Sequence, residues 1–75
     1  MFATELFGNR LKALRTSRNL TLTQVGEVIS FTKSAIGNLE HGRKKPSVDV
    51  VVELANYFEV STDYLLGLTD NPERR

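Results

Sequence analysis

The stretch from residue 31 to residue 40 (FTKSAIGNLE) carries side chains suited to nucleic-acid recognition. Ile36 and Leu39 are spaced as the buried side of a short helix. The opposite side is small or polar, with Lys33, Ser34, Gly37 and Asn38. A basic run, residues 43–45, follows a few positions later. Because ammonium, hydroxyl and amide groups hydrogen-bond to base edges and phosphates, this stretch predicts a recognition helix for the DNA major groove.

Helix-capping signals recur along the chain and define the elements that must hold this stretch. Serine or threonine can cap a helix at Thr4, Thr21, Thr32, Ser47 and Ser61. The strongest signal is the capping box of Thr21 with Gln24, three residues later. Apolar residues at helical spacing follow the caps. The last helix is expected over residues 62–68. The first helix is expected to end at Asn19, as the left-handed residue after its last turn. The sequence therefore predicts a compact all-α domain of five short helices.

Gly26 lies in the middle of the expected second helix. A glycine there costs about 1 kcal/mol relative to alanine, so its presence suggests that another helix crosses too closely for a β-carbon. Val25 is expected to be buried in this helix, together with either Val28 or Ile29.

Composition limits the classes of function. The chain has 75 residues, enough for one small domain, with no cysteine and one histidine, so neither a disulfide framework nor a metal centre is expected. It contains no membrane-length apolar run and no signal-peptide pattern at the N-terminus, so an intracellular, cytoplasmic protein is expected. The absence of a glycine-rich phosphate loop and of a carboxylate pair for a cleft argues against an enzyme, and no cofactor or small-molecule ligand is indicated.

Charge is distributed unevenly, although the net charge is only +1. Residues 1–45 contain eight Lys/Arg and three Asp/Glu, whereas residues 46–75 contain two Lys/Arg and six Asp/Glu. This asymmetry indicates one half that faces a polyanion and one half that faces something else, with chance clustering on a solvated surface as the alternative.

Residues 22–41 fit the twenty-residue helix-turn-helix pattern. The pattern requires a small residue where the helices cross, and Gly26 occupies that position. Its apolar positions are Val25, Ile29, Phe31, Ile36 and Leu39. Further matching segments are LKALR (11–15), LEHGR (39–43), PS (46–47) and VSTDYLLG (60–67). In this ordered combination, the chain resembles the Cro/repressor (lambda-repressor-like, XRE-type) family over residues 7–68.

The resemblance implies both a fold and a function. The fold is a five-helix lambda-repressor-like domain over residues 1–68, followed by residues 69–75 as a flexible tail or the start of a linker. The function is that of a sequence-specific transcriptional regulator that binds double-stranded DNA, and a repressor in particular. A homodimer would bind a palindromic operator with its third helix in the major groove, so a nucleoid-associated protein is expected.

The resemblance also assigns roles to individual positions. Base contacts fall on Thr32, Lys33, Ser34 and Asn38. Phosphate contacts fall on Thr21, Thr23, His41, Arg43, Lys44 and Lys45. An ion pair between Arg15 and Glu40 would join the first helix to the end of the third. The acidic half of the chain would lie away from DNA, so a two-fold contact between copies is expected at Tyr57, Tyr64 and Leu68, with closure of the core as the alternative role of these residues.

Two positions depart from the family pattern. Leu22 stands where glutamine is usual, and leucine cannot contact a phosphate or base as glutamine does, so this contact is lost or made by neighbours such as Thr23. Ser30 stands where glycine usually forms a left-handed turn, so this turn is expected to be strained or altered. Gly37 either lets the backbone approach DNA closely or is a tolerated surface glycine.

The competing hypothesis is a helix-turn-helix module that binds a protein, of the antitoxin or anti-repressor type. Gly37 and the missing glutamine favour this alternative, whereas the basic run at 43–45 argues against it. The expected partners are therefore double-stranded DNA and a second copy of the chain, with a protein anti-repressor as a further candidate. No membrane partner is expected.

Overall fold

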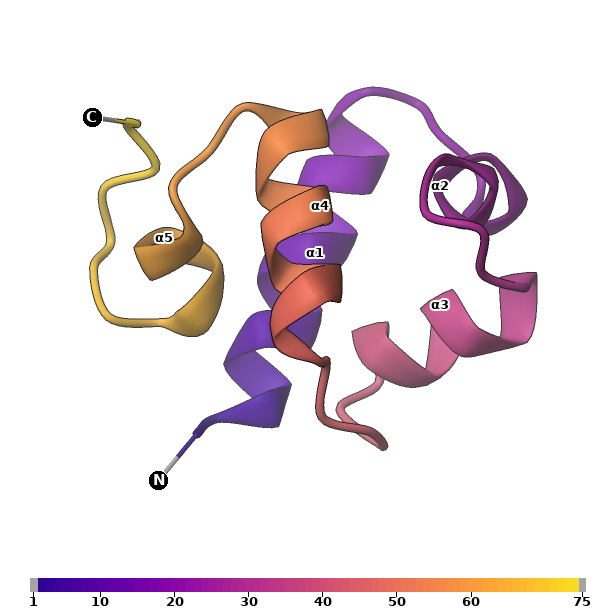
Figure 1. Ribbon diagram of the computed structural model, residues 1–75, viewed down its shortest axis with the longest axis horizontal. Coiled ribbons are helices and arrows are strands. Elements are labelled where there is room, and N and C mark those ends of the chain that lie inside the picture. Colours follow the sequence, from indigo (N-terminus) through magenta and orange to yellow (C-terminus); the bar gives the residue numbers. More distant parts are fainter. Residues whose placement is uncertain (1, 75) are drawn as a thin grey trace.

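The computed structural model describes residues 2–74 and contains, within that range, five α-helices and no β-strand. They are α1 (Thr4–Ser17), α2 (Leu22–Val28), α3 (Lys33–Glu40), α4 (Val48–Phe58) and α5 (Thr62–Leu66). Figure 1 shows α1 and α4 in the middle of the molecule, α2 and α3 on one side, and α5 with the C-terminal segment on the other. The predicted all-α, five-helix architecture is confirmed.

Side-chain caps begin four of the five helices, as predicted. Their hydroxyl oxygens accept a backbone N–H three residues later at Thr21, Thr32, Ser47 and Ser61. The prediction that Thr4 caps α1 is wrong. Ala3 is the N-cap and makes no side-chain hydrogen bond, while its carbonyl accepts the N–H of Phe7, so Thr4 is already inside the first turn.

A single cluster of buried apolar side chains joins all five helices. Its largest fully buried members are Phe7, Leu11, Val25, Ile36, Leu54, Phe58 and Leu65. Of the two candidates at the end of α2, Ile29 is buried and Val28 is exposed. Because α3 contributes Ile36 and Leu39 to this cluster, the core fixes which side of α3 faces outward.

The fifth helix ends at Leu66, two residues earlier than expected. Gly67 has a φ of +83°, and its N–H bonds to the carbonyl of Tyr64, while the N–H of Leu68 bonds to the carbonyl of Asp63. This pair of bonds is a Schellman motif, which satisfies the last carbonyls of the helix and turns the chain away from its axis.

Residues 67–74 contain no helix, but they fold back onto the domain (Figure 1). The N–H of Ser61 bonds to the carbonyl of Pro72 at 3.0 Å. The guanidinium of Arg74 donates to the carbonyl of Ala55 and to the side chain of Asn56. These contacts bring residues 69–74 alongside the end of α4 and the start of α5.

Candidate nucleic-acid interface

The connection between α2 and α3 is a tight turn whose geometry depends on one glycine. The N–H of Phe31 bonds to the carbonyl of Gly26 at 2.7 Å. A β-carbon added at Gly26 would lie 2.4 Å from the carbonyl oxygen of Phe31, well inside contact distance. The prediction that Gly26 has no room for a β-carbon is therefore confirmed, but the expected crossing helix is wrong, because the obstructing atoms belong to the backbone of the turn. Ser30 has a φ of +58°, so the left-handed turn is kept by a non-glycine residue, which is the strained geometry expected rather than an altered turn.

The outward side of α3 carries the side chains expected to contact bases. Lys33 and Ser34 are exposed, and Asn38 is half-buried. Thr32, just before the helix, is exposed as well, and its hydroxyl oxygen accepts the N–H of Ala35 at 3.1 Å. A hydroxyl that accepts one bond can still donate, so capping does not prevent Thr32 from contacting a partner.

A basic loop leaves the C-terminal end of α3. Gly42 has a φ of +71°; its N–H bonds to the carbonyl of Leu39, and the N–H of Arg43 bonds to the carbonyl of Asn38. This second Schellman motif directs the chain into an exposed loop bearing His41, Arg43, Lys44 and Lys45. Within residues 2–74, none of these four side chains forms an ion pair or a hydrogen bond with the protein.

The start of α2, next to α3, offers backbone hydrogen-bond donors. Thr21 and Gln24 form the predicted capping box, with bonds of 3.1 Å and 2.8 Å in the two directions. This box occupies the N–H groups of Thr21 and Gln24 and leaves those of Leu22 and Thr23 without an acceptor in the described chain. Free N–H groups at a helix N-terminus attract anions, so they suit a phosphate.

An ion pair joins α1 to the C-terminal end of α3. The Nε atom of Arg15 lies 2.6 Å from Oε2 of Glu40, and the Nη2 atom of Arg15 lies 3.1 Å from Oε1 of Glu40. Glu40 is buried, and Arg15 also donates to the carbonyl of Leu20 at 2.8 Å. The hydrogen bond to Glu40 raises the pKa of Arg15 above its ordinary value. This two-pronged contact fixes the C-terminal end of α3 against α1.

Gly8 brings these two helices together and was missed at the sequence level. A β-carbon at Gly8 would lie 2.4 Å from the carbonyl oxygen of Glu40 and 2.6 Å from that of Leu39. A glycine in the middle of a helical pattern was the available signal, as it was at Gly26.

A family model described as "Helix-turn-helix" (HTH_3) matches residues 11–65, which include α2, α3 and the turn between them. This chain belongs to the helix-turn-helix family. The predicted family resemblance is confirmed, and for this domain the family and fold are those of a DNA-binding class rather than of an enzyme, as expected.

One relative of this helix-turn-helix chain is an uncharacterized HTH-type transcriptional regulator from Bacillus subtilis (strain 168), named YobD. The two are 44% identical over 68 residues, which make up 91% of this chain and 61% of the relative. A second relative, the transcriptional regulator ImmR from the same strain, is 35% identical over 80% of this chain and 47% of its own length. The chain therefore spans about half of the length of these relatives.

The fold is also found in solved structures. The P22 c2 repressor protein in complex with a synthetic operator superposes with a TM-score of 0.77 and 26% identity, covering 81% of this chain and 92% of that one.

Arg10 and Arg18 contribute to the excess of positive charge in residues 1–45, but both bind groups within the domain. Arg10 donates to the carbonyls of Tyr64 and Thr69 and to the carboxylate of Asp70, and its guanidinium lies 4.2 Å from the centre of the Tyr64 ring. Arg18 donates to the carbonyl of Phe58 at 2.7 Å. With Arg15 paired as well, the cations of residues 1–45 that have no partner within residues 2–74 are Lys12, Lys33 and those of the basic loop.

The residues expected at a contact between copies belong to α4, to α5 and to the segment after α5. Tyr57 and Tyr64 are half-buried, whereas Leu68 is 74% exposed. Tyr64 belongs to α5, which Figure 1 shows on the side of the molecule opposite α3.

An exposed apolar surface at the start of α4 was not predicted from the sequence. Val48 is 78% exposed and Val52 is 42% exposed. They border an open groove of about 350 Å³ whose other lining residues are Phe2, Lys45, Pro46, Val51, Thr62 and Leu66. The available signal was the cluster of four valines between residues 48 and 52, which exceeds what one side of a helix can bury.

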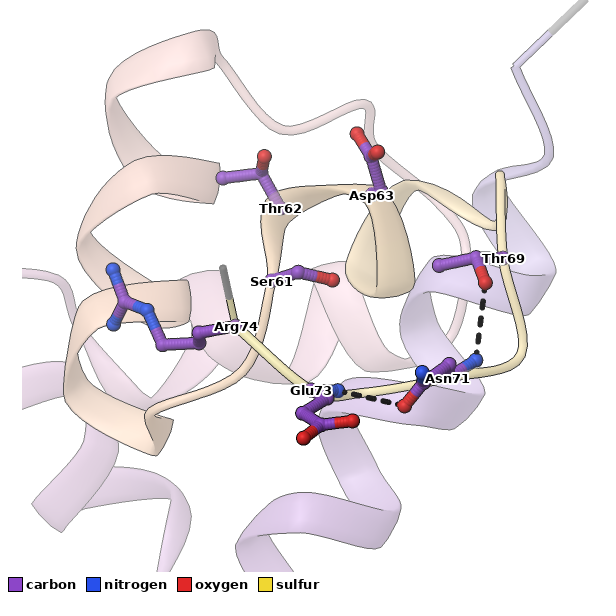
Figure 2. A pocket seen from close by; sticks show the side chains of 7 residues that line it. All are labelled: Ser61, Thr62, Asp63, Thr69, Asn71, Glu73 and Arg74. Atoms are coloured by element: carbon purple, nitrogen blue, oxygen red, sulfur yellow. Dashed lines mark hydrogen bonds between the residues drawn. The ribbon is translucent and has the colours of Figure 1, made fainter.

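A further hollow is polar and lies away from the helix-turn-helix. It has a volume of about 410 Å³ between the start of α5 and the C-terminal segment. Figure 2 shows Thr69, Asn71 and Glu73 linked by hydrogen bonds along its edge. Within residues 2–74, no group of three His, Cys, Asp or Glu side chains is placed to hold a metal ion, and no helix is long and apolar enough to cross a membrane.

Proposed function

We propose that this helix-turn-helix domain is the sequence-specific DNA-binding part of a transcriptional regulator that acts as a repressor. Two copies bind a palindromic operator in double-stranded DNA, each with α3 in the major groove. The observation that carries this proposal is the pairing of an outward polar side of α3 with an exposed basic loop whose charged side chains form no ion pair or hydrogen bond within residues 2–74. The family, the regulator names of the relatives and the operator-bound P22 c2 repressor support it.

Each base-contacting residue has a distinct chemical role in this proposal. The ammonium of Lys33 donates to O6 and N7 of guanine, and the amide of Asn38 pairs with N6 and N7 of adenine. Ser34 and Thr32 supply hydroxyl groups to neighbouring base edges. These few side chains cannot specify a long site, so specificity also requires a second copy of the domain and sequence-dependent DNA shape.

The phosphate contacts orient α3 in the groove. Thr21 and Thr23 present hydroxyl groups at the start of α2, on one side of the recognition helix, and the backbone N–H groups of Leu22 and Thr23 are free there. His41, Arg43, Lys44 and Lys45 contact the backbone from the other side. Because Leu22 replaces the usual glutamine, the N–H groups of Leu22 and Thr23 supply the contact that the glutamine side chain would make.

The contact between copies involves Tyr57, Tyr64 and Leu68. The exposure of Leu68 supports a role outside the core, because an apolar side chain left 74% exposed has few contacts within its own chain. A contact built from so few residues is small, so dimerisation is weak in free solution and is completed on the operator. The proposed location of the protein is the cytoplasm, on the nucleoid.

The second candidate function is a protein-interaction module, and the groove beside Val48 and Val52 favours it. Exposed apolar surface of this kind marks a contact with another protein. An anti-repressor that occupied this groove would also be compatible with the DNA-binding proposal, since Lys45 belongs both to the groove and to the basic loop.

Salt dependence separates DNA binding from protein binding. Residues 43–45 supply three cations per protomer and six per dimer, so the logarithm of the association constant should fall with the logarithm of salt concentration with a slope of about −5. Fluorescence anisotropy on a labelled duplex between 50 and 200 mM salt gives this slope. A slope near zero, or no binding to duplex at low salt, would remove the proposal.

A further inference from the structure

Gly37 lies in the middle of α3, and nothing in the fold requires a glycine there. A β-carbon added at Gly37 would meet a single atom within 4 Å, the Cδ1 of Leu22 at 4.0 Å, which is ordinary contact. Gly37 is also absent from the residues with positive φ, among which the glycines are Gly42 and Gly67. A helical glycine is less stable than alanine at the same position, so the fold bears a cost here that it does not explain.

The contrast with the other helical glycines sharpens this point. A β-carbon at Gly8 or Gly26 would lie 2.4 Å from a carbonyl oxygen, so both positions exclude any side chain. At Gly37 the space is open. No contact within the described residues therefore requires this glycine, which leaves a tolerated surface glycine or a contact outside the domain as its explanation.

Leu22 forms one wall of the open space above Gly37. It is the first residue of α2, is half-buried, and packs partly against the core. Its side chain has no hydrogen-bonding group, and its δ-methyl faces the bare backbone of Gly37. Together these two residues leave a small apolar surface with room for a β-carbon, the Leu22–Gly37 notch, beside the polar side chains of α3.

We propose that the Leu22–Gly37 notch receives the 5-methyl group of a thymine in the major groove, so that Leu22 and Gly37 are specificity-determining residues. This inference rests on the proposed function. The thymine methyl is the apolar group that the major groove displays, and an apolar contact with it distinguishes an A·T pair from the other base pairs. A side chain at position 37 would fill the notch, and a polar side chain at position 22 would present a hydrogen-bonding group to the methyl.

The Leu22–Gly37 notch also implies that having leucine instead of the usual glutamine at position 22 changes which base group is recognised. A glutamine at position 22 reads a hydrogen-bonding group, whereas Leu22 reads a methyl. The domain therefore exchanges one kind of base recognition for another, and its operator contains a thymine at a fixed position in each half-site.

Removing single methyl groups from the DNA tests this inference. The operator is first recovered by selection from random duplex DNA, and each thymine of one half-site is then replaced in turn by uracil, which lacks only the 5-methyl. We expect one position at which the affinity of the native protein falls about fourfold, the loss that corresponds to one buried methyl group. Uracil at the other positions should leave the affinity unchanged.

Two variants with opposite effects on stability should share one effect on recognition. Gly37→Ala fills the notch and should raise Tm by about 4–8 °C, because alanine favours the helix. Leu22→Ala removes the wall and should lower Tm. Both should bind the thymine and uracil operators equally, so the fourfold discrimination is lost in each. Glu53→Ala, at an exposed position of α4, is the matched control and should retain discrimination.

Each remaining outcome overturns the inference in a recognisable way. If no thymine is sensitive to loss of its methyl, the notch reads no methyl. If Gly37→Ala weakens binding to both operators by the same factor and keeps the discrimination, the glycine only allows close approach of the DNA. Failure of the native protein to bind any duplex removes the proposed function itself, which differs from a loss confined to one methyl.

Discussion

Removing the carboxylate of Glu40 should destabilise the domain and weaken DNA binding together. In the variant Glu40→Ala, the guanidinium of Arg15 loses its two bonds to the carboxylate and keeps its bond to the carbonyl of Leu20. The side chain of Arg15 is 15% exposed, so an unpaired charge remains largely buried. Breaking a buried pair by removing one partner costs about 3–5 kcal/mol.

The remaining solvation and the bond to Leu20 reduce this cost, so we expect a loss of about 2–3 kcal/mol in the free energy of unfolding. For a domain of this size, that loss lowers Tm by about 10–20 °C. Thermal unfolding followed by circular dichroism measures it. DNA affinity, compared at a temperature where both proteins are folded, should also fall, because Glu40 fixes the end of α3 against α1.

Two controls decide whether the ion pair is responsible. Glu53→Ala removes an exposed carboxylate from α4 and should change the free energy of unfolding by less than about 0.5 kcal/mol. The double variant Arg15→Met/Glu40→Leu removes both charges and should recover most of the stability that Glu40→Ala loses. If Glu40→Ala unfolds at the native Tm and binds DNA as tightly as the native protein, the reasoning is refuted.

Four further predictions concern the turn, the loop and the contact between copies. Gly26→Ala should destabilise the domain by more than about 2 kcal/mol in chemical unfolding, because its β-carbon would meet the carbonyl of Phe31; unchanged stability would contradict the crossing geometry. Ser30→Gly should raise the free energy of unfolding by about 0.5–1 kcal/mol without changing DNA affinity, since glycine adopts positive φ without strain; a less stable variant would argue against this. Lys44→Ala should reduce the magnitude of the salt-dependence slope by about 2 per dimer and weaken binding to all sequences equally; an unchanged slope would exclude a phosphate contact. Leu68→Glu should weaken self-association in sedimentation at high protein concentration, and a dimer of native strength would exclude Leu68 from the contact.

Local signals account for the parts of this fold that the sequence predicts well. The capping box of Thr21 and Gln24 depends on residues three positions apart, so its spacing is visible in the sequence. The buried residues Ile36 and Leu39 follow from helical spacing for the same reason. The error at Thr4 is also local, because several residues near the start of α1 are compatible with its first turn.

Contacts between distant residues could not be predicted in this way. Arg10 binds the carbonyl of Thr69 and the carboxylate of Asp70, about 60 positions away, and no local pattern encodes that meeting. From the sequence, Arg10 was therefore assigned to a basic surface, whereas in the structure its guanidinium binds the C-terminal segment. The exposure of Val48 likewise depends on where α4 packs, which the apolar composition of the run does not determine.

Selection of bound sites from random double-stranded DNA tests the central claim most directly. The account predicts a palindromic consensus whose half-sites are separated by about one helical turn, 10–10.5 base pairs between centres. It also predicts a guanine for Lys33 and an adenine for Asn38 within each half-site. Recovery of no enriched sequence, or of a consensus without two-fold symmetry, would contradict a homodimer that reads an operator through α3.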